Sequence, residues 1–140
     1  MSIDTDDRTT IYRTRQLDAG QSEEEAVGYI DAGGVIHRFQ WGKGLPMGRV
    51  DSDMRVFRAM QYGERELGQA LPTGAVRSTG VLEGGDVGWM DPDGVVMQGG
   101  LIMGEEEVGR VQGPLALAAA AALLLLFLPD EAEANRRAAR

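Results

Sequence analysis

Short apolar and polar stretches alternate along most of the chain, around glycines that recur at a regular spacing. Each of these glycines follows an apolar residue, and the second residue after it is apolar as well. They lie 20, 20, 20 and 21 residues apart, at Gly28, Gly48, Gly68, Gly88 and Gly109. Period-two alternation over a few residues is typical of half-buried β-strands, and a fixed period of this length indicates an internal repeat. The pattern therefore predicts a series of related β units.

Each of the first four glycines is followed, three residues later, by a segment with the composition of a tight turn. These segments are Asp31–Gly34, Asp51–Met54, Leu71–Gly74 and Asp91–Gly94. Aspartate at the first position bonds the backbone ahead of it, proline at the second presets φ, and glycine at the fourth fits the exit geometry. The second residue after each turn is β-branched, as strands favour, at Ile36, Val56, Val76 and Val96. Each unit is thus predicted to be a β-hairpin.

The two ends of the repeat region each look like half of a hairpin. Residues Thr10–Arg13 resemble a returning strand without a partner, and Val108–Val111 resemble an outgoing strand without a return. If the halves pair, they close the array and remove its exposed edges. We therefore expect an all-β fold of four to five β-hairpin repeats of about twenty residues, in a closed or nearly closed radial array, followed by a C-terminal hydrophobic α-helix.

The same pattern divides the chain into three regions. Residues 1–26 form an acidic N-terminal segment with one strand near 10–14, residues 27–112 the hairpin-repeat domain, and residues 113–140 an apolar helix with a charged tail. The motif of apolar residue, glycine and a second apolar residue, then Asp-x-x-Gly, then a β-branched strand resembles the small bacterial "beta flower" hairpin-repeat proteins. The resemblance implies a fold of radiating hairpins, and it implies no activity and no functional residues.

The C-terminal region contains an unbroken run of fourteen apolar residues, Leu115 to Leu128. Its alanines and leucines, between Pro114 and Pro129, predict a helix that Pro129 ends. At about 1.5 Å per residue the run reaches only about 21 Å, short of the ~30 Å core of a bilayer. It is nevertheless apolar all round, whereas a helix that covers one side of a ring should show a polar stripe. Membrane insertion as a transmembrane helix and burial in an oligomer or against the ring both remain open.

Charge and composition narrow the classes of partner. Acidic residues outnumber basic ones by 22 to 14, for a net charge of −8, and phosphate binding needs a basic face. We therefore expect no nucleic-acid partner. The chain has no cysteine, hence no disulfide and no thiolate metal site. Its acidic start predicts no signal peptide, so the expected localisation is cytoplasmic or membrane-associated.

No constellation of residues predicts catalysis. His37 is the only histidine and lies on a predicted strand, and none of the serines has the context of a nucleophile elbow. The aspartates at 91 and 93 lack the twelfth-position acidic ligand of a calcium loop, and no glycine motif fits a nucleotide phosphate. We expect neither an enzyme, nor a cofactor, nor a metal.

The remaining hypotheses concern binding. In a radial array the position after each repeat glycine would gather a mixed aromatic and cationic set suited to protein contact, namely Tyr29, Arg49, Gln69, Trp89 and Arg110. The leading hypothesis is a non-enzymatic interaction or scaffold module that binds a protein partner or self-associates, with the apolar tail holding it at a membrane or in an oligomer. The alternative is a repeat protein that binds a small ligand or carbohydrate through Tyr29, Trp89, Arg38 and Arg58.

Overall fold

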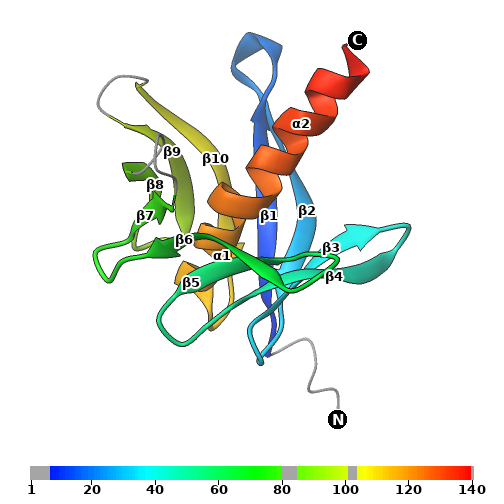
Figure 1. Cartoon of the computed structure of the whole chain (residues 1–140). Helices are drawn as coiled ribbons and strands as arrows, with labels where there is room; N and C mark the ends of the chain where they lie inside the picture. Colours follow the sequence, from blue (N-terminus) through cyan, green and yellow to red (C-terminus); the bar gives the residue numbers. More distant parts are fainter. Residues whose placement is uncertain (1–6, 80–84, 101–103, 140) are drawn as a thin grey trace.

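The chain folds into a closed antiparallel β-barrel with its C-terminal helix running through the middle (Figure 1). A computed structural model describes residues 7–79, 85–100 and 104–139. The strands are β1 (Thr9–Gln16), β2 (Ser22–Ile30), β3 (Val35–Gln40), β4 (Lys43–Val50), β5 (Arg55–Ala59), β6 (Glu64–Ala70), β7 (Ala75–Ser78), β8 (Gly85–Met90), β9 (Val95–Gly100) and β10 (Gly104–Gln112). Strands that follow one another in the chain are neighbours in the barrel. The predicted all-β fold of hairpins in a closed array is confirmed.

The barrel closes where its first and last strands meet. β1 pairs with β10 in antiparallel register, with Ile11 opposite Val111 and Arg13 opposite Gly109. The two half-hairpins of the sequence thus complete one another. The N-terminal segment, residues 1–26, contains more strand than predicted, because β2 already begins at Ser22. The run Glu23–Glu25 therefore lies in a strand. Residues 1–6 of that segment are outside the described residues.

The four tight turns have the predicted chemistry. In each, the N–H of the fourth residue donates to the carbonyl of the first, at 2.9 to 3.0 Å. In three turns, an Oδ1 atom of the first-position aspartate also accepts two backbone N–H groups, as Asp91 does from Asp93 and Val95 at 2.9 Å. The fourth residue has a positive φ, which glycine adopts without strain, and in the second turn Met54 takes this conformation instead, with φ of 64°.

A β-bulge precedes every repeat glycine. Opposite the pair Ile11–Tyr12, for example, stand Gly28 and Ala26, so Val27 is the extra residue of β2. Equivalent register shifts occur at the other four glycines. A bulge changes the alternation of faces, so the apolar residue before the glycine and the second one after it can both pack inward. This explains why the sequence places apolar residues on both sides of each glycine at those offsets.

The repeat glycines themselves provide room inside the barrel. A Cβ atom built on any of them would lie 2.0 to 2.2 Å from a carbonyl oxygen of the neighbouring strand. Four of the five would also press on the helix, as Gly88 would against Leu124. Large helix side chains therefore pack against the glycines, and the buried alanines of the helix belong to the same core as the strand isoleucines and valines. Large and small side chains are matched between the two surfaces.

The central helix consists of α1 (Ala116–Ala122), a π-helical turn (Leu123–Phe127) and α2 (Leu128–Ala138). Residues 118–128 are buried on every side by the strands. The expected polar stripe is missing because the ring surrounds the helix rather than flanking it. Burial against the ring is therefore correct, and the transmembrane prediction is not supported: among the described residues, no helix has the length and apolar character to cross a bilayer.

The prediction that Pro129 ends the helix is wrong, since α2 continues through it to Ala138. Pro129 follows directly on the π-helical turn, where the N–H of Leu128 donates to the carbonyl of Leu123, five residues back. Proline thus occupies the start of a new α-helical segment, where its fixed φ suits the helix and its missing N–H is tolerated. The charged tail is consequently a helix that emerges from the barrel.

Candidate functional site

The barrel has two different ends. The four tight turns, between β2 and β3, β4 and β5, β6 and β7, and β8 and β9, lie together with the start of α1, and we call this the turn end. At the other end the β1–β2, β3–β4 and β5–β6 hairpins splay outward around the emerging α2, and we call their outer ends the hairpin tips (Figure 1). Loops that a rigid scaffold positions commonly carry function, so both ends are candidate surfaces.

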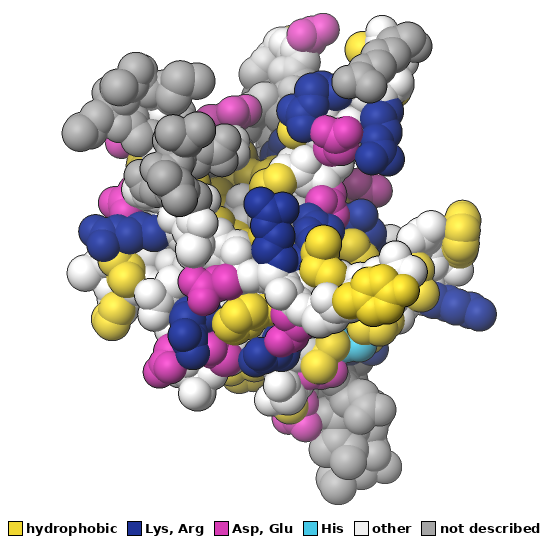
Figure 2. Space-filling model, viewed as in Figure 1, with side chains coloured by type: hydrophobic (Ala, Val, Ile, Leu, Met, Phe, Trp, Pro, Cys, Tyr) yellow, Lys and Arg dark blue, Asp and Glu magenta, His cyan; other side chains and the backbone are white. Residues whose placement is uncertain are grey.

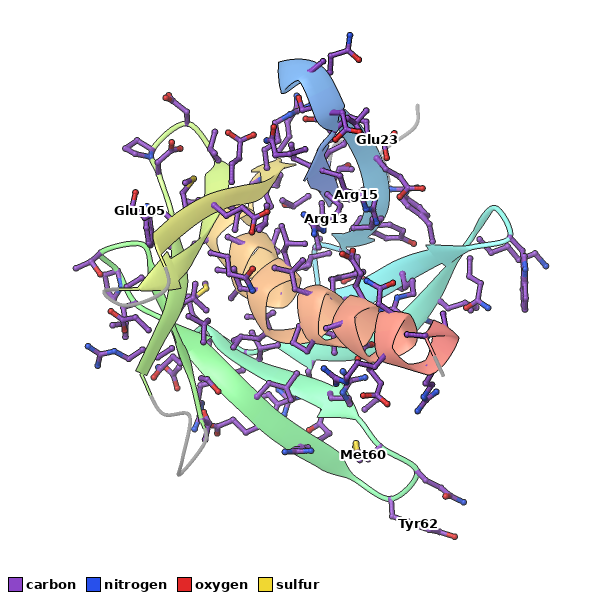
Figure 3. All side chains as sticks on the ribbon, turned by 90° about the horizontal axis from the view of Figure 1, so that it is seen from above. Arg13, Arg15, Glu23, Met60, Tyr62 and Glu105 are labelled. Carbon is purple, nitrogen blue, oxygen red and sulfur yellow. The ribbon has the colours of Figure 1, made fainter. Side chains whose placement is uncertain are left out.

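Two neighbouring hairpin tips expose large apolar side chains. Trp41, at the tip between β3 and β4, is 88% exposed, and Tyr62, between β5 and β6, is 89% exposed. Met60 accompanies Tyr62 and is 47% exposed (Figure 3). Figure 2, in the same view as Figure 1, shows a hydrophobic and a basic side chain near each other where the β3–β4 hairpin projects. Tryptophan and tyrosine are the residues that most often anchor protein interfaces.

Trp41 is also unfavourable for its own backbone. Gln40 pairs with Lys43, so Trp41 and Gly42 form a two-residue turn, with φ of 52° and 75°. Turns of this type favour asparagine or glycine at both positions, and a bulky residue with positive φ costs roughly 1–2 kcal/mol. An exposed tryptophan that strains the backbone does not serve stability. Such outliers are typical of functional positions.

The residues after the repeat glycines form a belt around the outside of the barrel. They occupy every second strand, at Tyr29, Arg49, Gln69, Trp89 and Arg110. The arginines are engaged locally: Arg49 pairs with Glu64 at 2.7 Å and lies over Phe57, and Arg110 pairs with Glu24 at 2.8 Å and lies over Tyr12. Trp89 is half-buried opposite Ala75. The structure thus distributes this set around the circumference and does not bring it into one cluster.

Tyr29 belongs to a small stack near the turn end. Its ring stacks on His37 at 4.5 Å, and His37 Nε2 lies 3.0 Å from Asp31 Oδ2. Burial tends to raise the pKa of Asp31, but hydrogen bonds from His37 and from the backbone N–H groups of Val35 and Gly33 outweigh it and hold that pKa below its ordinary value. The carboxylate is therefore held by its own turn, and the stack is explained by local structure.

Four arginines from three strands converge on α2 where it leaves the barrel. Arg38 and Arg58 both donate to Asp130. At the next residue of the helix, Arg13 and Arg15 donate to Glu131 at 2.9 and 3.1 Å. Figure 3 shows Arg13 and Arg15 on the part of β1 that lies beside the helix. A small ligand that used both Arg38 and Arg58 would have to displace Asp130 from them.

Three of these arginines, Arg13, Arg15 and Arg38, border a cleft of about 330 Å³ between the central helix, the β1–β2 hairpin and β3. Hydrogen bonds from Arg13 lower the pKa of Glu131, burial opposes this, and the charges of Arg13 and Arg15 add to the lowering. Glu131 is consequently ionised at neutral pH and fixed in place. The cluster ties the emerging helix to the hairpins.

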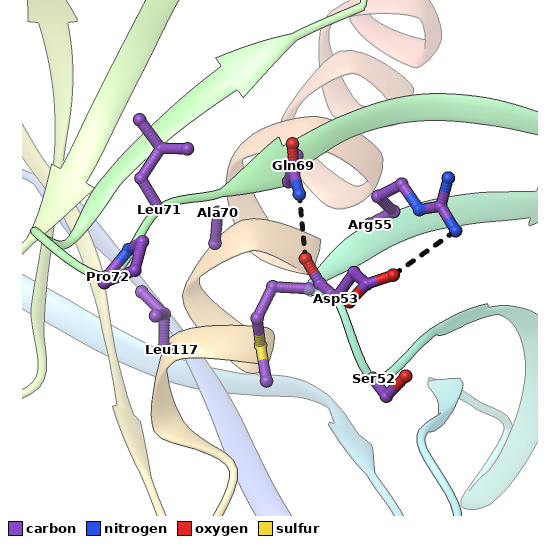
Figure 4. Close-up of a pocket in the computed structure, with 9 residues that line it drawn as sticks. Ser52, Asp53, Arg55, Gln69, Ala70, Leu71, Pro72 and Leu117 are labelled. Carbon is purple, nitrogen blue, oxygen red and sulfur yellow. Dashed lines mark hydrogen bonds and ion pairs between the residues drawn. The ribbon is translucent and has the colours of Figure 1, made fainter.

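A second cleft, of about 640 Å³, opens at the turn end between the second and third turns (Figure 4). Its apolar lining is Met54, Ala70, Leu71, Pro72 and Leu117. The polar residues on its border are Ser52, Asp53, Arg55 and Gln69, and the Nε2 of Gln69 donates to the carbonyl of Asp53 at 2.9 Å. The volume lies in the range of roughly 300–1,000 Å³ that is typical of ligand pockets.

Sequence reasoning missed the exposed tip at Trp41 and the cleft at the turn end. The signal for the exposed tip was the Trp-Gly pair between two strand patterns, which fits a two-residue hairpin turn. The signal for the cleft was the small residue Ala70 where other units have larger apolar residues. In the described parts of the chain, no three His, Cys, Asp or Glu side chains are grouped to hold a metal ion.

Neither the models of protein families, nor the curated proteins, nor the solved structures gave a match to this chain.

Proposed function

We propose that the chain is a non-enzymatic protein-interaction module that binds its partner through the β3–β4 and β5–β6 tips, with Trp41 as the anchor. The observation that carries the proposal is the combination at Trp41 of 88% exposure and a positive φ. Neither property contributes to folding, so the residue is better explained by what it contacts outside the chain. The radiating hairpins also support, at the level of fold, the resemblance to beta flower proteins.

The scaffold suits this function because it presents the anchor rigidly. The β3–β4 hairpin is joined by a two-residue turn and continues into a closed barrel with a fully buried core. A tryptophan side chain has only two rotatable bonds, and its backbone is already fixed here. Little conformational entropy is then lost on binding, which favours affinity at a small contact.

The test separates function from stability at the same residue. Replacing Trp41 with asparagine, which tolerates positive φ, should raise the free energy of unfolding by about 1 kcal/mol and abolish binding. A photoreactive amino acid at position 41, introduced in cells of the source organism, should yield a discrete crosslinked species. The same group at position 89, on the half-buried belt, is the matched control.

Two results would contradict the proposal. One is a destabilised Trp41→Asn variant, which would mean that the side chain supports the fold. The other is equal crosslinking from positions 41 and 89, which would mean that the tip has no particular partner. Urea denaturation followed by circular dichroism supplies the first measurement, and gel mobility with mass spectrometry the second.

A further inference from the structure

We propose that the partner of the Trp41 tip is a second copy of this chain, whose turn-end cleft receives the tryptophan, so that molecules associate head to tail. The inference rests on the proposed function, because it uses the same anchor. The inference adds the site that receives Trp41, and each copy of the chain carries both the Trp41 tip and the cleft.

The cleft exists because the third repeat departs from the others. The position two residues after each repeat glycine packs inward, and it is Ile30, Val50, Ala70, Met90 and Val111 in the five units. Alanine leaves space at Ala70 that a larger side chain fills elsewhere. Leu117 of the helix and Pro72 of the third turn line this space (Figure 4), and Met54 of the second turn lines it as well. The result is an apolar hollow at the turn end of the barrel.

The charge at the cleft matches the charge beside Trp41. The turn end carries five aspartates in its turns, at Asp31, Asp51, Asp53, Asp91 and Asp93. Asp53 lies at the border of the cleft with 70% of its side chain exposed, and Arg55 is shared between it and Asp51. On the tip, Lys43 is the only lysine of the chain and stands two residues from Trp41. An occupant that presents an aromatic ring beside a positive charge therefore fits this cleft, and the tip is such a group.

The contact cannot form within one molecule. Strand β4 runs from the tip at Lys43 to the second turn after Val50, and its eight residues span about 26 Å at roughly 3.3 Å each. The tip and the cleft are thus at different ends of the barrel. A contact between two different surfaces of identical copies is heterologous, and it leaves a free tip and a free cleft on every assembly that does not close into a ring.

The size of the contact predicts weak association. One tryptophan buries about 150–250 Å², far below the roughly 1,200 Å² of stable interfaces. Self-association should therefore be detected by sedimentation velocity as a sedimentation coefficient that rises with concentration up to about 1 mM, where such weak contacts become populated.

Two variants that each lack one half of the contact give the decisive experiment. Trp41→Ala removes the anchor and keeps the cleft, whereas Ala70→Met fills the cleft, as Met90 does in the next unit, and keeps the anchor. Each variant alone should stay monomeric at concentrations at which the natural chain associates. Their equimolar mixture should form dimers that do not grow further. A natural chain that stays monomeric, or variants that associate as it does, would overturn the inference.

A pair of surface variants keeps the test valid if Ala70→Met fails to fold. Asp53→Lys and Lys43→Glu each place like charges across the contact, so each should associate at least several-fold less than the natural chain. In their mixture every contact between one variant and the other joins opposite charges, so association should return; no recovery would contradict the inference. Crosslinks from position 41 distinguish this failure from that of the proposed function: a species with twice the mass of the chain supports self-association, and another mass supports a different protein partner.

Discussion

Replacing Gly109 with alanine should destabilise the barrel at the seam where it closes. A Cβ atom at Gly109 would lie 2.1 Å from the carbonyl oxygen of Tyr12 on β1 and 2.7 Å from Leu123 of the helix, whereas real contacts of this kind stay above 3.0 Å. Strands β1 and β10 must then separate by about 1 Å. We expect overpacking to cost about 1–3 kcal/mol, and the loosening of about two backbone hydrogen bonds between β1 and β10 to cost about 1 kcal/mol each.

The total, roughly 3–5 kcal/mol, is a large part of the 5–15 kcal/mol by which domains are stable, and it corresponds to a fall in Tm of about 10–20 °C. Urea denaturation followed by circular dichroism measures it. Gly33→Ala is the matched control, because the nearest atom there, Oδ1 of Asp31, lies at 3.4 Å, an ordinary contact; its effect should stay within about 0.5 kcal/mol. A Gly109→Ala variant as stable as the control would refute the argument that these glycines exist to make room.

Three further predictions concern the helix, its anchor and the turns. A chain that ends at Gly113 should be unfolded by circular dichroism, because the six buried side chains of 123–128 contribute roughly 9–18 kcal/mol; a cooperative melt at the natural Tm would contradict this. The pKa of Glu131 lies below its ordinary value of 4.5 in the folded state, so its ion pairs stabilise the protein above pH 4.5 and are lost as the pH falls further. Glu131→Gln should therefore lower the free energy of unfolding by about 1–2 kcal/mol at neutral pH and flatten the dependence of stability on pH below 4.5. An unchanged dependence of stability on pH would contradict the role of Glu131 in holding the helix to the hairpins. Asp91→Ala removes two hydrogen bonds from the fourth turn and should cost about 1–2 kcal/mol in thermal unfolding, with a cost near zero telling against the role of the aspartate.

The turns, the hairpins and the closure of this fold could be predicted from the sequence, because the residues that specify them recur in every unit. Each unit had to place the same turn residues and the same glycine at the same offsets, and the unpaired halves at Thr10–Arg13 and Val108–Val111 predicted the closure that β1 and β10 make. What the repeat could not give was the reason for its glycine. That reason is the close approach of a neighbouring strand and of the helix, a contact over long sequence distances.

The helix and the candidate surfaces were harder to predict for related physical reasons. A helix that is apolar on every side is equally compatible with lipid and with a surrounding ring, and only the tertiary structure distinguishes the two. The belt from Tyr29 to Arg110 follows from the repeat, yet a closed barrel spreads equivalent positions around its circumference. Trp41 lies in a connector, where the units differ from one another, so the repeat carried no information about it.

The fit between ring and helix also limits how such a protein can change over evolutionary time. The diameter of a barrel grows roughly in proportion to its number of strands, and a helix with its side chains is about 10–12 Å wide. Repeat proteins ordinarily lengthen or shorten by gaining or losing a unit. Here a duplicated hairpin would enlarge the ring around an unchanged helix and leave a void along residues 118–128. The number of hairpins and the width of the central helix must therefore change together, because an added hairpin requires larger side chains to fill the barrel.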